Sequence, residues 1–174
     1  MAGRSAKTKG KSYEREVCQI MKDIFGGNWI RSFTSGAFTG GVNAARLAQL
    51  TKNQIQNNRG DICVDDSMSN LVIECKSYKD FSWNIFTDTG SNAQLDGWLE
   101  QVENDVVNNE FYFLTFKINN CGRRIVVRTD LTTDCVIPTN YSVYLYNDRT
   151  YYVCKLEDFL KNNVDKIRDK CKPQ

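Results

Sequence analysis

Two acidic residues and a lysine stand beside or inside apolar runs, where a charged side chain is costly to bury. Asp61 precedes the run at 62–64, and Glu74 and Lys76 belong to a second run that begins at Leu71. Strand residues two apart leave the same face, so Glu74 and Lys76 are expected to point the same way. Because such charges must be paired or bind a cation when buried, this stretch is a candidate for chemistry.

The three side chains predict a divalent-cation site with a lysine beside it. If the runs at 61–64 and 71–76 form an antiparallel hairpin, the carboxylates of Asp61 and Glu74 converge at one edge of the sheet. Close carboxylates raise each other's pKa, and Mg²⁺ removes this repulsion while using one or two carboxylates as ligands. Mn²⁺ is expected to substitute. Lys76 can then orient or help deprotonate an attacking water, or steady the charge of a pentacoordinate phosphate.

A purely structural explanation exists for each residue. Asp61 could follow a turn at a strand entry, and Glu74 and Lys76 could form the polar face of an edge strand. Two observations favour the cation site. Glu14 falls on the apolar arc of a predicted first helix, and the segment 26–60 carries basic residues without one acid.

Composition excludes several kinds of chemistry. The chain of 174 residues has no histidine, which rules out Ser-His-Asp and Cys-His catalysis and histidine general bases. Its seven cysteines are odd in number, lie mostly in apolar runs and form no C-x-x-C pair, so we expect reduced thiols and a cytoplasmic protein. No apolar stretch approaches the roughly 20 residues of a membrane helix, and no secretory signal is visible.

Basic residues gather at the start of the chain, although the net charge is only +2. Uneven charge of this kind suits binding of a polyanion by one face, and a solvated basic tail is the alternative. The residues expected to follow a nucleic-acid backbone are Arg4, Lys7, Lys9, Lys11, Arg31, Arg46, Lys52 and Arg59.

The expected elements indicate a flexible basic arm at 1–11 and a single domain at 12–174 with an inserted segment at about 40–58. Helices are predicted at 12–25, 44–55, 92–107 and 156–170, and strands at 29–33, 61–64, 71–76, 111–118, 124–128, 141–146 and 151–154. Asp65 and Asp66 are interpreted as turn residues. This order favours an α/β (α+β) domain with one mixed sheet flanked by helices.

Several motifs together resemble the PD-(D/E)xK nuclease superfamily, and within it the archaeal-type Holliday-junction resolvases, which also occur in viruses and phages. They are Lys9-Gly10-Lys11-Ser12-Tyr13-Glu14-Arg15-Glu16, Arg31-Ser32 before a Gly/Ser loop, Gly60-Asp61-Ile62 and Ile73-Glu74-Cys75-Lys76. The resemblance covers residues 9–76 and implies a restriction-endonuclease-like fold.

The resemblance also implies roles for single residues. The metal ligands would be Glu14, Asp61, Glu74 and the backbone carbonyl of Cys75, with Lys76 as the catalytic lysine. Ser32 or Ser35 would match the loop serine near the scissile bond. Gln94, four residues before Trp98, is similar to the Gln-x-x-x-Tyr element of RecB-like nucleases, and a polar residue beside a core tryptophan is the alternative.

The leading hypothesis is a Mg²⁺-dependent, structure-selective DNA endonuclease. Such an enzyme can be encoded by a phage or a virus. A four-way junction has two-fold symmetry, so a homodimer would present two sites to it. The insertion at 40–58 and the longer chain beyond 119 depart from the family pattern and bear on substrate choice. The alternatives are a restriction-type, repair or RNA-directed nuclease on the same core, or a non-catalytic nucleic-acid-binding module.

Overall fold

The computed structural model describes residues 6–32, 59–83, 91–106 and 110–173, with side chains from Lys9 onward. The expected loop at 34–41, the expected helix at 44–55, the inserted segment and Arg4, Ser35, Arg46 and Lys52 lie outside these residues. The helices and strands are α1 (Ala6–Phe25), β1 (Ile30–Arg31), β2 (Ile62–Cys63), β3 (Leu71–Tyr78), α3 (Ala93–Asp105), β4 (Phe111–Ile118), β5 (Gly122–Arg128), β6 (Tyr141–Tyr146), β7 (Arg149–Lys155), α4 (Leu156–Asn162) and α5 (Val164–Cys171).

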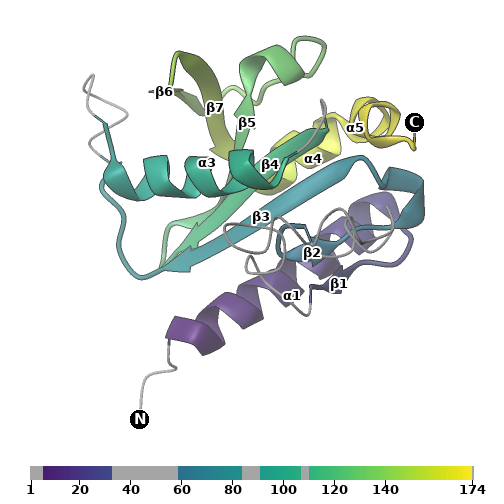
Figure 1. Cartoon of the computed structure of the whole chain (residues 1–174), viewed down its shortest axis with the longest axis horizontal. Helices are drawn as coiled ribbons and strands as arrows, with labels where there is room; N and C mark the ends of the chain where they lie inside the picture. Colours follow the sequence, from purple (N-terminus) through teal and green to yellow (C-terminus); the bar gives the residue numbers. More distant parts are fainter. Residues whose placement is uncertain (1–5, 33–58, 84–90, 107–109, 174) are drawn as a thin grey trace, which may run out of the picture.

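A five-stranded mixed sheet in the order β3-β4-β5-β7-β6 forms the centre of the fold. β3 and β4 are parallel, and the other neighbours are antiparallel. Figure 1 shows α3 on one side of this sheet and α1 on the other, with β3 at the edge between them. The predicted α+β fold, a mixed sheet flanked by helices, is confirmed.

Each face of β3 packs into a separate core. Leu71, Ile73 and Cys75 join the cluster that contains α1, α4 and α5, while Val72 joins the cluster under α3. A strand covered on both faces reads as a continuous apolar run, which explains its sequence. By alternation, Glu74 and Lys76 leave on the α3 side.

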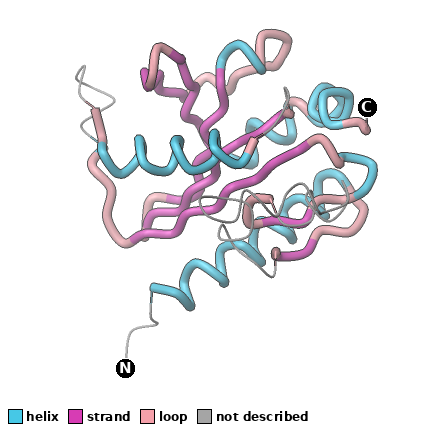
Figure 2. The backbone as a smooth tube through the Cα atoms, viewed as in Figure 1, coloured by secondary structure: helices cyan, strands magenta, loops and turns pink. Residues whose placement is uncertain are grey.

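The predicted hairpin of 61–64 with 71–76 is wrong. β2 pairs with β1 in an antiparallel ladder that places Ile30 opposite Cys63, whereas β3 pairs with β4. Figure 2 shows the short β1–β2 pair lying beside α1. The connection from β2 to β3 is a 3₁₀ turn and not a hairpin loop, and the carboxylate of Asp65 before it accepts hydrogen bonds from the amides of Asn28 and Ser67.

The first helix begins earlier than predicted, at Ala6 and not at Ser12. Residues 6–11 of the expected flexible arm are therefore helical, although this stretch includes Gly10, which disfavours a helix. The helix ends at Phe25 as predicted, where Gly26 takes a φ of 70° and its amide bonds the carbonyl of Lys22 at 2.9 Å.

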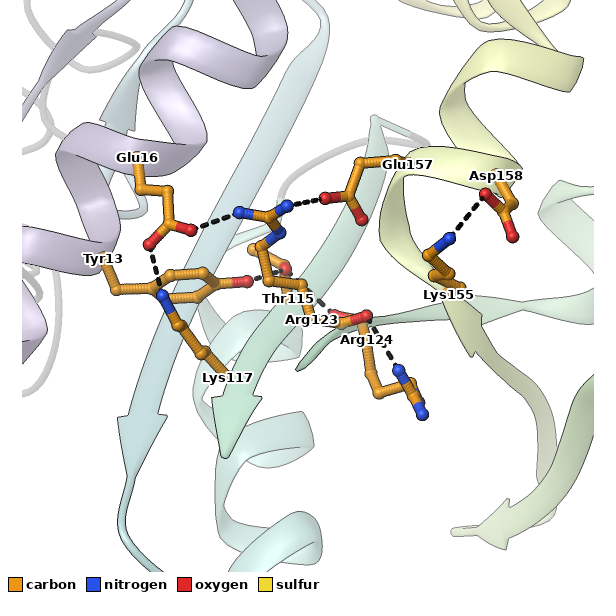
Figure 3. Close-up of polar contacts among 9 residues, drawn as sticks. All are labelled: Tyr13, Glu16, Thr115, Lys117, Arg123, Arg124, Lys155, Glu157 and Asp158. Atoms are coloured by element: carbon orange, nitrogen blue, oxygen red, sulfur yellow. Dashed lines mark hydrogen bonds and ion pairs between the residues drawn. The ribbon is translucent and has the colours of Figure 1, made fainter. Parts of the chain in front are cut away.

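An ion-pair network fixes the rotation of α1 on the sheet (Figure 3). Glu16 accepts hydrogen bonds from Lys117 of β4 and Arg123 of β5, and Arg123 also pairs with Glu157 of α4. Since side chains two apart on a helix point about 200° apart, this anchor turns Glu14 away from β4 and β5.

The predicted C-terminal helix is broken in two at the buried Asn163. Its side chain donates to the carbonyls of Val136 and Phe159 and accepts from the amide of Val136. The side-chain amide of Asn163 thus pairs with both backbone groups of Val136 and with the carbonyl of Phe159 in α4.

We expect Asn163→Ala to lower the free energy of unfolding by about 2–3 kcal/mol, because it leaves buried backbone groups without partners. Urea denaturation measures the change. Asn162→Ala is the matched control, since this neighbouring asparagine is exposed, and it should change stability by less than about 0.5 kcal/mol. Equal effects of the two substitutions would contradict the assigned role.

All seven cysteines are free, and Cys18, Cys63, Cys75 and Cys154 are buried as predicted. In the part of the chain that the structure describes, no helix has the length and apolar character needed to cross a membrane.

Candidate active site

Asp61 is held in place by backbone contacts on both sides. Its amide donates to the carbonyl of Ile73 at 2.9 Å, and its carbonyl accepts from the amide of Ser32 at 2.8 Å. Gly60 before it has a φ of +61°, and a Cβ there would lie 2.5 Å from the carbonyl oxygen of Ile73. Glycine is therefore required for the close approach that brings Asp61 to β3.

Asp61 and Glu74 form the predicted pair of buried carboxylates. The side chains are 6% and 1% exposed, respectively, and Asp61 accepts a hydrogen bond from the amide of Cys75 at 2.9 Å. Burial raises the pKa of Glu74 to about 8, and the charge of Asp61 adds to the increase. Burial also raises the pKa of Asp61, which shares a side-chain hydrogen bond with Glu74. Burial and mutual repulsion therefore disfavour two negative charges at this site unless a cation is bound.

Lys76 lies beside Glu74, as the spacing of the two residues predicts. Its Nζ is 2.7 Å from Oε1 of Glu74 and 2.6 Å from Oε1 of Gln101 on α3. Gln101 also donates from Nε2 to the same oxygen of Glu74 at 2.6 Å. One glutamine thus fixes both the carboxylate and the ammonium group, a role for which the sequence pattern gave no signal.

Glu14 is buried on α1, as its place on the apolar arc predicts, and is paired with Arg31 of β1 at 3.2 Å. Burial raises its pKa, and the charge of Asp61 adds to this effect. Glu14 therefore lies close enough to Asp61 for their negative charges to repel. Arg31, which we expected to follow a nucleic-acid backbone, contacts an acid of the site itself.

A fourth buried carboxylate was missed by the sequence reasoning. Asp105 at the end of α3 is 8% exposed, and its Oδ2 has no hydrogen-bond partner within the described residues. Burial raises the pKa of Asp105, and repulsion from the charge of Asp61 raises it further. An Asn-Asp pair at the end of a helix is not distinctive in the sequence, so only the folded structure shows that Asp105 is buried.

The carboxylates fit a divalent cation of the Mg²⁺ type. Asp61 and Glu74 are desolvated oxygen donors whose repulsion a cation would remove, and Mg²⁺ commonly binds one or two carboxylates and keeps several waters. No group of three or more Cys, Asp or Glu side chains within the described ranges is arranged as a ready-made cage. The arrangement is a two-carboxylate site with Glu14 nearby.

The other predicted site residues are placed as follows. The amide of Cys75 points to Asp61, so its carbonyl faces the same strand edge. Ser32 is buried and meets Asp61 through its backbone, while its hydroxyl lies beside the Cys63 thiol. Gln94 is in the first turn of α3, about 10 Å along the helix from Gln101.

Of the basic residues expected to contact a nucleic acid, the two described arginines are paired with acids. Arg59 pairs with Glu110 at 2.6 Å, as Arg31 does with Glu14, so both guanidinium groups stabilise acids of the fold. Lys9 lines cavities beside β3, as described below. Lys11 is partly exposed on α1, and of Lys7 only the backbone is described. Contacts of these residues with a nucleic acid stay a prediction.

A mixed sheet whose edge strand presents Glu-x-Lys next to a buried aspartate defines the chain as a nuclease of the PD-(D/E)xK type. Comparison with known families agrees: the chain belongs to the family described as "Phage putative PDDEXK endonuclease", whose model matches residues 5–172. No curated protein and no solved structure matches the chain. The superfamily inferred from the motifs at 9–76 is thus confirmed over nearly the whole chain.

Proposed function

We propose that this nuclease is a Mg²⁺-dependent DNA endonuclease that selects branched DNA, four-way junctions above all, and acts as a homodimer. The observation that supports cleavage is the buried Asp61–Glu74 pair with the Nζ of Lys76 at 2.7 Å from Glu74. Burying two carboxylates against each other costs free energy, which a cation-binding function explains and a structural role does not.

Each residue has a separate task in this proposal. Asp61 and Glu74 hold the cation, and the backbone carbonyl of Cys75 faces the same position. A divalent cation bound there would neutralise the two carboxylates and polarise the scissile phosphodiester. Lys76 keeps its ammonium group at the site through Glu74 and Gln101, where it can orient the attacking water or stabilise the negative charge of the pentacoordinate phosphate.

Selection of branched DNA is supported by the resemblance to junction resolvases and by the two-fold symmetry that a dimer shares with a four-way junction. The deciding experiment compares cleavage of a four-way junction, a linear duplex of the same sequence and a single strand, with Mg²⁺ and with EDTA. We expect Mg²⁺-dependent cutting of the junction at least about tenfold faster than of the duplex. Light scattering should give the mass of a dimer, twice the 20.0 kDa of the chain.

The outcomes separate the alternatives. Equal cutting of duplex and junction would favour a restriction-type or repair nuclease and contradict junction selection. Salt-dependent binding without cleavage under any metal condition would favour a non-catalytic binding module. A monomer that cuts the junction symmetrically would contradict the dimer but not the nuclease.

We expect Gln101→Ala to reduce the cleavage rate by about 10- to 100-fold, because residues that orient ligands and catalytic groups typically contribute this much. The reason is the pair of 2.6 Å hydrogen bonds that join Gln101 to Glu74 and Lys76. Gln94→Ala decides between the two glutamines of α3. A larger loss of rate in Gln94→Ala than in Gln101→Ala would return the accessory role to Gln94.

A further inference from the structure

We infer that the groove along the free edge of β3 binds an unpaired DNA strand next to the scissile phosphate, with a base stacked on Tyr78 and the backbone contacting Lys9 and Lys79. The inference rests on the proposed function and deepens it: it names a structural feature that would favour branched DNA, whose strands can be unpaired at the branch point, over a continuous duplex.

Two cavities adjoin along this edge. The larger, about 440 Å³, is lined by residues of the first turns of α1 and the end of β3, including Lys9, Lys76 and Tyr78. The smaller, about 200 Å³, lies between α1 and the end of β4 and shares Lys9 and Ser77 with the first. The catalytic lysine is therefore part of the wall, and a strand in the groove passes directly by the site.

Tyr78 offers an aromatic surface that is exposed and rigid. Its side chain is 44% exposed, at the end of the edge strand β3. Its ring lies 5.0 Å from the ring of Trp98, which in turn packs at 5.8 Å from Phe81 and 5.5 Å from Phe116. An anchored ring needs no ordering on binding, so one face of Tyr78 is ready to stack on a base.

The charges along the groove favour a phosphate backbone. Lys9, Lys76 and Lys79 line the larger cavity, and no acid lines it within the described residues. Lys79 is 3.8 Å from Asp80, but both side chains are more than three-quarters exposed, so this pair contributes little. In the smaller cavity the acid is Glu16, whose charge is balanced by Lys117 and Arg123 (Figure 3).

The size of the groove favours an unpaired strand over a duplex. A volume of about 440 Å³ lies within the roughly 300–1,000 Å³ of sites that enclose one small molecule, which suits one nucleotide and not a base-paired helix. In a duplex the bases are stacked on each other, so their faces cannot reach Tyr78. An aromatic side chain between lysines is the arrangement that binds single strands without reading their sequence.

The test measures binding by fluorescence anisotropy in EDTA, where no cleavage occurs. The labelled probes are a 12-nucleotide single strand, a hairpin duplex and a splayed duplex with single-stranded arms. Tyr78→Ala should weaken binding of the single strand and the splayed duplex by about tenfold, and of the hairpin by less than twofold. Tyr78→Phe, which keeps the ring, should bind like the wild type.

Two controls keep the result independent of folding. Tyr78→Leu preserves apolar contact with Trp98 but has no aromatic face, so it should bind as weakly as Tyr78→Ala. Tyr141→Ala removes a tyrosine of similar exposure, 49%, which also packs on another ring, that of Tyr152 at 5.3 Å. It lies on β6, the opposite edge of the sheet, and should leave binding unchanged.

A direct readout is photocrosslinking of a strand that carries 5-iododeoxyuridine, with the attached peptide mapped by mass spectrometry to Tyr78. The inference is overturned if Tyr78→Ala binds all probes like the wild type, if it weakens the hairpin as much as the single strand, or if Tyr78→Phe is as weak as Tyr78→Ala. Because these assays contain no metal, they are separate from the cleavage test: crosslinking at Tyr78 without cleavage of any substrate would refute the nuclease proposal and leave the groove standing.

Discussion

Glu74→Ala is expected to reduce Mg²⁺-dependent cleavage by at least about 10³-fold while the protein stays folded. Glu74 contributes one of the two buried carboxylates and also holds the ammonium group of Lys76 at 2.7 Å. Its removal therefore takes away a proposed cation ligand and also releases Lys76. Initial rates on the preferred DNA substrate, at saturating Mg²⁺, measure the effect.

Two substitutions make this result specific. Glu74→Gln keeps the shape of the side chain and its contact with Gln101 but lacks the charge, so it should lose nearly as much activity as Glu74→Ala. Asp66→Ala removes an exposed acid of the nearby 3₁₀ turn and should change the rate by less than twofold. Substantial cleavage by Glu74→Gln would show that the charge of Glu74 is dispensable and would remove it from the catalytic centre.

The charged residues of the candidate site were predictable because they conflict with their surroundings. A glutamate and a lysine in an apolar strand, and a glutamate on an apolar helix face, are local signals that need no knowledge of the fold. Gly60 is different: it was part of the motif Gly60-Asp61-Ile62, but the need for a glycine there arises from the close approach to the carbonyl of Ile73, which only the structure shows. Asp65 as a turn residue was equally local, since its side chain caps the residues that follow.

The strand pairing that brings Asp61 next to Glu74 was not predictable from the same signals. Asp61 reaches Glu74 through the β1–β2 pair and the carbonyl of Ile73, and the parallel partner of β3 is β4, more than 30 residues further along the chain. Periodicity reports which face of a strand is apolar and says nothing of its neighbour. The predicted convergence of the two carboxylates was right, whereas the hairpin from which it was predicted was wrong.

Gln101 and Asp105 were missed for a related reason. Polar residues on a helix ordinarily face solvent, and the pattern of α3 gives them no distinction from Glu100 or Asn104. Asp105 is buried and Gln101 half-buried because α3 lies over the edge of β3 where Glu74 and Lys76 emerge. Asn163 is similar: its helical spacing predicts continuation, and its contacts with Val136, distant in sequence, end the helix.

The metal-free protein is expected to lose stability as the pH rises from 5 to 8.5. In the folded state the pKa of Glu74 is raised to about 8 by burial and by Asp61, against an ordinary value of 4.5 in the unfolded chain. Between these two values the folded state binds more protons than the unfolded state, so the free energy of unfolding falls with increasing pH. The pKa values of Asp61, Glu14 and Asp105 are also raised, and they act in the same direction.

Over this range we expect a loss of about 3 kcal/mol, since one pKa unit corresponds to about 1.4 kcal/mol and part of the shift is shared between coupled groups. Urea denaturation in EDTA at several pH values measures it. Glu74→Gln cannot ionise and should flatten the curve, becoming more stable than the wild type at pH 8.5. Glu16→Gln removes an acid whose pKa is lowered, so it should shift the curve without flattening it.

Mg²⁺ should reverse the trend in the wild type, because it binds the ionised carboxylates and stabilises the folded state most where Glu74 would otherwise be forced to lose its proton. In Glu74→Gln the same concentration of Mg²⁺ should raise stability much less. A metal-free wild type whose stability is constant or increases up to pH 8.5 would show that Glu74 is ionised in the folded protein without a cation. The argument that the site needs a divalent cation to hold two charged carboxylates would then fail together with the prediction.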